Sequence, residues 1–486
     1  MVEYEAVIGM EVHAQLLTKS KMFCQDDAQV FGAEPNTHVC PVCLGMPGVL
    51  PVANRRAVEH SLMVGLALNC QIAELAVFSR KNYFYPDLPK SYQISMYDLP
   101  LCRMGWIEIA DAARQENLLR RIRIRRVHLE EDTAKSFHAG AHSLVDFSRS
   151  GLPLIEIVTE PDIRTPEEAR RYLVKLRTIL RYLGVSTGDM EKGAMRCEPN
   201  VSVRPLGSEA FGTKVEVKNL NSFRSVKLAL EYEIERQTRL IDAGHQVGQV
   251  TMGWDEQREQ TVQQRVKEES DDYRYFAEPD LPPLRIPRVW LDKIRARLPE
   301  LPDAKRDRFA AAFGLPWADA AVLAAEHDMA LYFEAVVAAG QQRGLAPKTI
   351  SHWVIGELFH LLKTRAIEIS DGKVTPTYLA ELIALVQAGT ITAGSGRAVL
   401  GEMLSTGLAP GDIVRDRGLG QISDQDRITQ VVERVLADNP EQVAKYREGK
   451  ETLLRWFVGQ VMKAMGGKAN PQVVTDLVER GLARGG

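Results

Sequence analysis

The sequence lacks the short motifs that mark many nucleotide-binding and hydrolytic enzymes. It contains no G-x-x-x-x-G-K-[ST] phosphate loop, no G-x-G-x-x-G between a strand and a helix, and no G-x-S-x-G nucleophile elbow. Any use of a nucleoside triphosphate therefore requires a less common site. Any hydrolytic nucleophile that the reaction needs is expected on another chain.

Other absences narrow the class of protein. The N-terminal residues have no basic segment followed by an apolar one, and no run of about 18 apolar residues occurs, so we expect a cytoplasmic protein without a signal peptide or membrane span. Six cysteines in 486 residues are too few for a disulfide framework. With a net charge of −3, any nucleic acid must be bound by local basic patches.

Residues 1–295 have the pattern of a mixed domain. "YEAVIGMEVHAQL", "LIEIVTEP", "NVSVRP" and "TKVEVKNL" alternate or are β-branched, as half-buried strands do. "TPEEARRYLVKLRTILRYLGV" predicts a helix with Thr165 at its N-cap, Pro166 at its first position and Gly184 after its end, and a second helix ends before Gly244. Strands and helices without a regular βαβ rhythm indicate the α+β class.

The remainder of the chain is expected to be helical. The proline-rich "AEPDLPPLRIPRVW" ends the first region, and residues 296–410 form an all-α domain in which "PWADAAVLAAEHDMALYFEAVVAAG" is one helix. "STGLAPGDIVRDRGLGQIS" has the composition of a linker. Residues 411–486 then form another small helical unit.

Charged and imidazole side chains recur inside the apolar strand-like segments. They are Glu11 and His13, then His128, Glu130, Glu131 and Asp132, and then Glu156 and Glu160. Residues two or four apart on a strand share a face, so Glu11 lies beside His13, and Glu156 beside Glu160. A charge inside an apolar strand is costly unless it is paired or binds a metal.

Two interpretations of these carboxylates stay open. Glu11 and Glu156 could form buried ion pairs with arginines such as Arg149 or Arg204. Alternatively, oxygen ligands with an imidazole suit Mg²⁺ or Mn²⁺, which neutralises phosphate charge during phosphoryl transfer. Three such segments in one region favour the metal.

A second pattern mixes basic and aromatic residues. "SRKNYFYPDLPKSYQISMYD" contains Lys81 and Lys90, and "RVKEESDDYRYFAEPDLPPL" contains Tyr273, Tyr275 and Phe276. Such stretches bind an RNA end by stacking and phosphate contact, or simply cover the face of a sheet.

Taken together, stretches along nearly the whole chain resemble the B-subunit family of the glutamyl/aspartyl-tRNA amidotransferases. They are "VIGMEVHAQL", "FGAEPNTHVCPVCLGMPGVLPVAN", "RKNYFYPDLPKSYQIS", "VHLEEDTAKS", "DFSRSGLPLIEIVTEPDI", "MRCEPNVSVRP", "EVKNLNSFRSV", "RVKEESDDYRYFAEPDLP" and "GQVMKAMGGKANP". The resemblance implies a glutamine-synthetase-like cradle at 1–295, a helical tRNA-binding domain at 296–410 and a mobile tail at 411–486.

The resemblance also implies a function. Family members are ligases that work with a glutaminase A subunit and a C subunit on misacylated tRNA, in some cases with the cognate aminoacyl-tRNA synthetase. The B subunit uses ATP and Mg²⁺, with Mn²⁺ as a substitute, to phosphorylate the side-chain carboxylate of Glu-tRNA(Gln) or Asp-tRNA(Asn). Ammonia from the A subunit, delivered through an internal channel, then displaces phosphate.

The family's site residues fall on three groups of positions in this sequence. The metal cluster falls on Glu11, His13, Glu156 and the pair Glu130/Glu131. Because side chains alternate along a strand, only one member of that pair is expected to bind the metal directly. The expected catalytic residues are Glu11, His13 and Glu156. The expected channel and pocket residues are Lys81, Lys90, Arg149, Arg204, Lys218 and Asn219. The expected tRNA contacts of the tail are Lys463, Lys468 and Asn470, which a helix-capping loop would also explain.

The cysteines of "NTHVCPVCLGMPG" are a further candidate site. Zinc-binding members of the family carry C-x-C upstream of this C-x-x-C, whereas this chain has Cys24 followed by Asp26 and one extra residue. Cys24, Cys40 and Cys43 completed by Asp26 or His38 form one possible zinc site. A loop that has lost its metal is the other possibility, and no βαβ pattern supports a redox role.

Two alternatives compete with the ligase interpretation. A non-catalytic tRNA-binding scaffold would need no carboxylates inside strands. A free-standing ligase acting on a small amino acid would turn over without tRNA and would give the helical tail no purpose.

Overall fold

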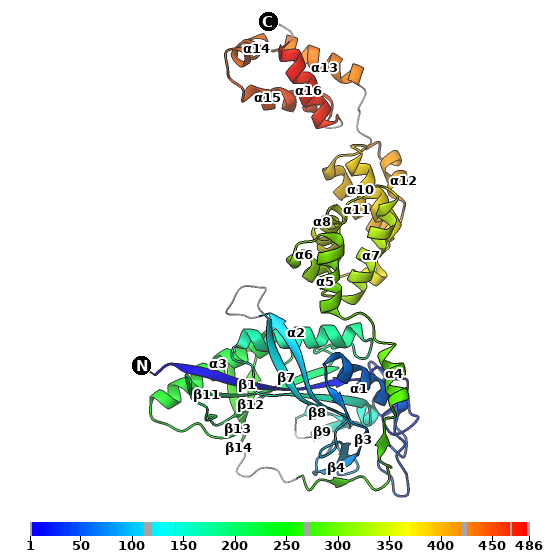
Figure 1. The fold of residues 1–486 in the computed structure, drawn as a ribbon, viewed down its shortest axis with the longest axis vertical. Coiled ribbons are helices and arrows are strands. Elements are labelled where there is room, and N and C mark those ends of the chain that lie inside the picture. The colour runs from blue at the N-terminus through cyan, green and yellow to red at the C-terminus, as the bar shows by residue number, and fades with distance from the viewer. Residues whose placement is uncertain are drawn as a thin grey trace. The chain divides into compact units, whose positions relative to one another are not determined.

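The computed structural model describes residues 2–110, 119–140, 142–266, 273–419, 425–466 and 469–483. These residues form two compact units, Met1–Pro302 and Asp303–Gly486. The first combines sheets with helices and the second is helical (Figure 1). The α+β class expected from the sequence is therefore confirmed.

The main sheet of the first unit consists of nine described strands in the order β14-β13-β12-β11-β1-β10-β7-β6-β2. These strands are β1 (Tyr4–Gln15), β2 (Gln71–Ile72), β6 (Cys102–Ala110), β7 (Leu119–Glu131), β10 (Pro153–Thr159), β11 (Met195–Pro205), β12 (Val215–Lys218), β13 (Val250–Asp255) and β14 (Gln260–Val266). Neighbours are antiparallel except β12 and β13, which run parallel. The four strand-like segments expected from the sequence are β1, β10, β11 and β12.

Smaller sheets lie beside the main one in the same unit. Their strands are β4 (Ser79–Asn82), β5 (Tyr92–Ser95) and β15 (Phe276–Ala277) in one sheet, β3 (Leu75–Ala76) with β16 (Leu284–Arg285), and β8 (Lys135–Ala139) with β9 (His142–Asp146). A 3₁₀ turn, η1 (Phe147–Arg149), follows β9. Because β5 contacts β7, the first of these sheets borders the main one.

Helices cover one face of the main sheet. The helices of the first unit are α1 (Arg55–Ala67), α2 (Pro166–Tyr182), α3 (Phe223–Asp242) and α4 (Arg288–Arg295). α2 and α3 lie side by side on this face (Figure 1). Ile8, Met10 and Val12 of β1 are at most 2% exposed and belong to the core beneath the helices. The odd-numbered residues of β1 consequently point to the opposite face, here called the open face.

The helix boundaries in the first unit follow from local sequence. The side chain of Thr165 accepts a hydrogen bond from the backbone of Glu168, whose carboxylate reaches back to the backbone of Thr165, so that α2 starts with a capping box. Gly184 and Gly244 follow the two long helices with φ of 63° and 77°, which a glycine adopts without strain. Both predicted helices are confirmed.

The second unit is helical and contains two hydrophobic cores. Its helices are α5 (Pro302–Phe313), α6 (Trp317–Leu323), α7 (His327–Gln341), α8 (Pro347–His352), a π-helical turn η2 (Trp353–Leu358), α9 (Phe359–Arg365), a 3₁₀ turn η3 (Ile369–Asp371), α10 (Pro376–Gln387), α11 (Ala393–Thr406), α12 (Pro410–Asp416), α13 (Gln425–Ala437), α14 (Pro440–Arg447), α15 (Leu453–Ala464) and α16 (Pro471–Ala483). One core gathers residues between 309 and 414, and the other gathers residues between 428 and 482.

Two expectations for this unit are wrong in detail. The single helix expected from residue 316 onward is two helices, because Glu326 is extended and the chain turns so that α6 and α7 both bury apolar residues in one core. The segment with linker composition contains α12, which starts at Pro410 and buries Ile413 and Val414 in that core. Burial of two apolar side chains therefore outweighs the glycine and proline content.

The end of the first unit lies later than the proline content indicates. α4 packs against α1, and Leu281, Ile286 and Ile294 belong to the first core, although four prolines precede them or lie between them. The proline-rich segment therefore lies within the first unit, which extends to Pro302.

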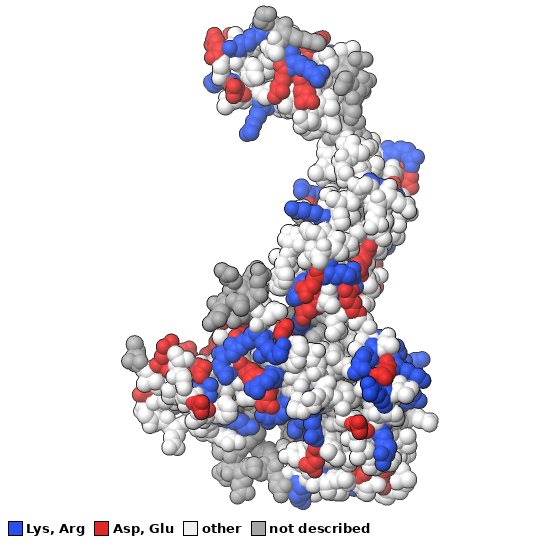
Figure 2. All heavy atoms as spheres, viewed as in Figure 1, with Lys and Arg blue, Asp and Glu red and all other residues white. Residues whose placement is uncertain are grey.

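The surface shows both signs of charge in each unit. Figure 2 shows lysine and arginine interspersed with aspartate and glutamate over the visible face, as the net charge of −3 implies. Among the described helices, none combines the length and apolar character needed to cross a membrane.

We expect Thr165→Ala to lower the free energy of unfolding of the first unit by about 1 kcal/mol, because the first turn of α2 loses its cap. Urea denaturation of the purified chain followed by circular dichroism measures the change. Thr187→Ala, which truncates an exposed threonine beyond the end of α2, is the matched control. Equal midpoints for the two variants would contradict the role assigned to the cap.

Candidate active site

Three neighbouring strands bring the predicted carboxylates and histidines together on the open face. In the register of the sheet, His13 of β1 lies opposite Glu156 of β10, and Glu156 lies opposite His128 of β7. Glu11 and Glu130 are two residues from His13 and His128 along their strands and share their face. We call Glu11, His13, His128, Glu130 and Glu156 the carboxylate cluster.

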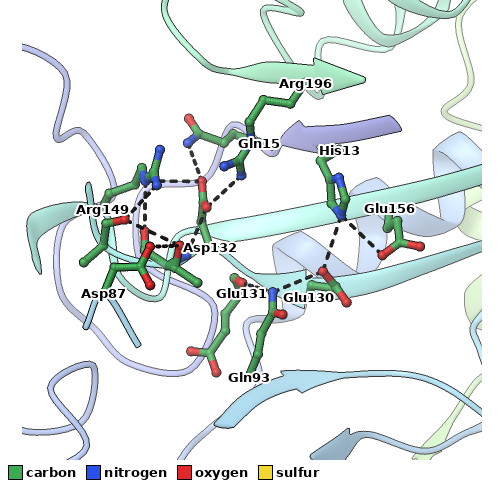
Figure 3. A network of polar contacts seen from close by, with 12 residues as sticks. His13, Gln15, Asp87, Gln93, Glu130, Glu131, Asp132, Arg149, Glu156 and Arg196 are labelled. Atoms are coloured by element: carbon green, nitrogen blue, oxygen red, sulfur yellow. Dashed lines mark hydrogen bonds and ion pairs between the residues drawn. The ribbon is translucent and has the colours of Figure 1, made fainter. Parts of the chain in front are cut away.

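The side chains of the cluster converge closely, and Figure 3 shows the imidazole of His13 directed toward Glu130 and Glu156. Nε2 of His13 lies 3.3 Å from Oε2 of Glu156, 3.7 Å from Oε2 of Glu130 and 3.9 Å from Oε1 of Glu11. Nε2 of His128 lies 3.5 Å from a carboxylate oxygen of Glu130 and 3.5 Å from one of Glu156. His13 therefore faces three carboxylates, and His128 faces two.

Burial makes this arrangement electrostatically demanding. Glu130 and Glu156 are 2% and 4% exposed. Burial, followed by repulsion from Glu156, raises the pKa of Glu11 to about 7. Burial acts in the same sense on Glu156, but His128 and His13 outweigh it and lower the pKa of Glu156 to about 2. The two glutamates thus differ in proton affinity because only Glu156 is flanked by both imidazoles.

The donor set fits a hard divalent cation. Ligand atoms of Glu11, His13 and Glu156 lie within 4.8 Å of one another, and so do those of His128, Glu130 and Glu156. Several carboxylates with imidazole are suitable ligands for Mg²⁺ or Mn²⁺. A cation here would also offset the mutual repulsion that burial imposes on the carboxylates.

Glu131 does not share this position, although it was expected among the ligands. Its carboxylate accepts a hydrogen bond from the backbone N–H of Ile94 (2.9 Å) and pairs with Lys90. Glu130 instead faces the cluster, where Ser95 Oγ (2.6 Å) and Gln93 Nε2 (3.1 Å) donate to it. The pleat of β7 turns the two glutamates to opposite sides, so we correct the ligand prediction to Glu130 alone.

Glu160 is also separated from Glu156, contrary to the expectation that they share a face. The pairing of β10 with β7 shifts its register between Val158 and Thr159. The carboxylate of Glu160 then lies 2.8 Å from Nη2 of Arg125, a pair that is partly exposed. The irregularity interrupts the alternation on which the expectation rested.

The predicted pocket residues fall into two groups, and three of them lie near the cluster. Lys81 of β4 stands opposite Gln93 and lies 4.9 Å from the ring centre of Tyr273. Burial would lower the pKa of Lys81, but Glu130 and Glu156 raise it above its usual value. Lys218 lies 2.9 Å from Glu198, which stands opposite Glu11.

Lys90, the third of them, borders a cavity that none of the cluster residues lines. This cavity has a volume of about 110 Å³ and is lined by Cys24, Cys43, Lys90 and Glu131 among others. Both members of the Lys90–Glu131 pair thus line this cavity, and Glu131 directly follows Glu130 of the cluster on β7.

The other three pocket residues have structural partners. Arg149 donates to the carbonyls of Thr133 (2.9 Å) and Ala134 (2.7 Å), and Asn219 donates to the carbonyl of Trp254 (3.0 Å). Arg204 pairs with Glu5 at 2.8 Å. Glu5 is six residues from Glu11 along β1, so this pair lies about 20 Å from Glu11. Neither Arg149 nor Arg204 pairs with Glu11 or Glu156 among the described ion pairs, and we withdraw Arg204 from the pocket.

Two residues near the site were missed by the sequence reasoning as site residues. Asp132, buried at the end of β7, binds Arg196 of β11 at 2.7 Å and accepts a hydrogen bond from Gln15 at 2.8 Å (Figure 3). The alternation of "MRCEPN", with buried Met195 and Cys197, already places Arg196 on the open face. That signal was available, but only the sheet register shows which residues Arg196 faces.

The three cysteines also converge, together with a lysine that the sequence did not single out. Sulfur atoms of Cys24, Cys40 and Cys43 lie within 4.8 Å of one another, and Asp26 Oδ2 is 3.7 Å from Cys43 Sγ. The buried ammonium of Lys21 lies 3.5 Å from that sulfur and donates to the backbone carbonyl of His38 (2.7 Å). A hydrogen bond from Cys24 lowers the pKa of Cys43 to about 6. Burial acts in the opposite sense, and Cys40 and Lys21 lower this pKa further.

Of the predicted tail contacts, Lys463 lies on α15 and Lys468 lies outside the described residues. Asn470 Oδ1 accepts a hydrogen bond from the backbone N–H of Gln472 (3.0 Å) at the start of α16. The capping explanation thus accounts for Asn470, while a role in tRNA binding stays a prediction.

Comparison with known proteins places these features in a family. Residues 6–292 match the family described as the GatB/GatE catalytic domain, and residues 331–482 match the one described as the GatB domain. Proteins named as the B subunit of aspartyl/glutamyl-tRNA(Asn/Gln) amidotransferase are similar over nearly their full length. The protein of Moorella thermoacetica is 53% identical over 99% of this chain and 100% of its own length. The protein of Thermodesulfovibrio yellowstonii is 52% identical over 98% of this chain and 98% of its own length.

We expect Glu156→Gln to weaken Mn²⁺ binding by at least about 10-fold, because Glu156 is common to both groups of ligand atoms. Titration of the purified chain with Mn²⁺, followed by electron paramagnetic resonance, measures the affinity. Glu160→Gln is the matched control, since it removes the same charge from the same strand end outside the cluster. Equal affinities for both variants would show that the cluster is not the metal site.

Proposed function

The chain belongs to the family of B subunits of the aspartyl/glutamyl-tRNA(Asn/Gln) amidotransferases, and we propose that it carries the ATP-dependent step of that ligase reaction. The substrates are the misacylated Glu-tRNA(Gln), Asp-tRNA(Asn) or both, and the products are Gln-tRNA(Gln) and Asn-tRNA(Asn). The observation that carries the proposal is the buried carboxylate cluster on the open face of the main sheet.

The chemistry requires activation of a carboxylate. A side-chain carboxylate is a poor acyl donor at neutral pH, because its leaving group would be an oxide. In the first step, an oxygen of the substrate carboxylate attacks the γ-phosphorus of ATP, the bond to the bridging oxygen breaks, and an acyl phosphate and ADP form. In the second step, ammonia attacks the acyl carbon, the C–O bond breaks, and phosphate leaves with one proton of the ammonia.

The cluster is suited to the first step. Glu11, His13, Glu156 and Glu130 would hold Mg²⁺ or Mn²⁺, which when bound neutralises phosphate charge. Gln93 and Ser95 fix the carboxylate of Glu130 by hydrogen bonds, so that it does not need to reorganise. Lys81 adds a positive charge on the same side, where phosphate oxygens would approach.

The second step depends on other chains. Because the sequence has no nucleophile motif of a glutaminase, we assign ammonia release to the A subunit of a heterotrimer that also contains a C subunit. We assign three residues to the ammonia path: Lys90 and Glu131, which line the cavity, and Lys81 at the cluster. The helical second unit, including Lys463, we assign to the body of the tRNA.

The scaffold alternative is not favoured. A protein that only binds tRNA has no use for carboxylates that repel one another on adjacent strands, since burying Glu130 and Glu156 costs free energy without serving RNA recognition.

We expect Glu11→Ala and Glu156→Ala to reduce ATP-dependent amidation by roughly 100-fold or more while leaving the dissociation constant for tRNA unchanged. The assay uses the assembled complex with ATP, glutamine and each misacylated tRNA, and filter binding measures tRNA affinity. Glu160→Ala serves as the control and should retain activity. Full activity in both cluster variants would refute the catalytic assignment.

We further propose a structural zinc site of Cys24, Cys40, Cys43 and Asp26, since three thiols and a nearby carboxylate fit zinc. Lys21 would offset the excess negative charge of this ligand set. The site lies beside the cavity that Lys90 and Glu131 line, so its proposed role is to hold that loop in place.

We expect elemental analysis to find about one zinc per chain in protein purified without chelators, and much less in Cys43→Ala. Cys70→Ala, which truncates a buried cysteine of the core, should keep its zinc. Wild-type protein without zinc would identify the loop as one that has lost its metal.

A further inference from the structure

A row of four side chains crosses the open face, one from each of β11, β1, β10 and β7. Arg196 stands opposite His13, and the row continues through Glu156 to His128. Facing residues on neighbouring antiparallel strands have Cβ atoms about 5 Å apart. The guanidinium of Arg196 therefore ends the row on the side of His13.

Arg196 is held in place by a buried carboxylate. Its Nη2 donates to Oδ1 of Asp132 at 2.7 Å, and Asp132 is 3% exposed. Asp132 directly follows Glu130 and Glu131 and is itself fixed by Gln15 Nε2 at 2.8 Å. The position of the guanidinium is thus tied to the two strands, β1 and β7, that carry most of the cluster.

Arg196 nevertheless keeps positive charge and hydrogen-bonding capacity. Asp132 also faces Arg149 at 3.8 Å, so one carboxylate serves two guanidinium groups and the three together carry a net charge of +1. A guanidinium has five N–H donors. Within the part of the chain that the structure describes, the side chain of Arg196 makes one hydrogen bond, that to Asp132, and this side chain is 36% exposed.

Lys81, on β4 opposite Gln93, adds its charge on the side of Glu130. Two further cations on this face have carboxylate partners that they share with no second guanidinium. Lys218 lies between Glu198 (2.9 Å) and Glu216 (3.6 Å), and Arg126 lies 3.5 Å from Glu156 of the cluster itself. An anionic substrate that approaches the carboxylate cluster is repelled by it, so it needs a cation whose charge is not already neutralised. Arg196 meets this requirement beside His13.

We propose that Arg196, positioned by Asp132, binds the anionic end of the aminoacyl substrate. The group it binds is the side-chain carboxylate before phosphoryl transfer and the acyl phosphate afterwards, both of which match the planar donors of a guanidinium. This assignment rests on the proposed function, but it concerns a residue outside the metal-binding cluster.

The first test compares two arginines of the same strand in the assembled complex. Arg196→Gln should raise KM for the misacylated tRNA about 10-fold and lower kcat/KM for amidation about 100-fold, since a hydrogen-bonded charge is lost. Arg204→Gln, which breaks the remote pair with Glu5, should change either value less than about 2-fold. Identical kinetics of the two variants, with an active wild type, would overturn the inference alone. An inactive wild type would instead refute the proposed function.

The second test separates substrate binding from a purely structural ion pair. Asp132→Asn keeps the charge of Arg196 and should leave KM within about 3-fold of the wild-type value. Arg196→Lys keeps an ion pair with Asp132 but loses the planar set of guanidinium donors, so it should raise KM. A structural pair predicts the reverse order, with Asp132→Asn the more damaged. These two variants decide the question even if Arg196→Gln does not fold, and that reverse order would overturn the inference.

Discussion

The burial of several carboxylates beside two imidazoles is the constraint on which the site depends. Glu130 and Glu156 are nearly inaccessible to water, where an unpaired charge is costly. His13 and His128 lie beside both carboxylates, and Ser95 and Gln93 donate hydrogen bonds to Glu130. Those partners come from β1, β5 and β7, so two sheets must pack correctly before the carboxylates have counter-charges. The helices on the opposite face supply the apolar core that holds these strands in register.

Strand geometry decides which charged residues belong to the site. One residue along β7 separates Glu130, which faces the cluster, from Glu131, which faces Lys90. A register shift in the pairing of β10 separates Glu156 from Glu160. Neighbouring glutamates in the sequence therefore have different partners, and the same polar face continues across β1 to Arg196.

Local structure was predictable where local interactions determine it. The cap of α2, the glycines after α2 and α3, and the strands with strict alternation follow from backbone preferences within a few residues. Predictions failed where distant burial decided the outcome. α12 forms within a segment of linker composition because Ile413 and Val414 find a core, and α6 ends early because α7 packs separately into it. Arg204 was expected among the pocket residues, yet its place along β11 puts it beside Glu5.

The sequence by itself determined the fold class, the family, and the set of strand-borne carboxylates and histidines, because alternation along a single strand shows which residues share a face. Tertiary structure alone decided which strands are neighbours and in what register. It placed Glu156 between His13 and His128, directed Glu131 and Glu160 elsewhere, and set Arg196 beside the cluster on Asp132. The physical reason is that most of these contacts join residues far apart in the chain, whose proximity depends on the packing of the whole sheet and not on any local preference.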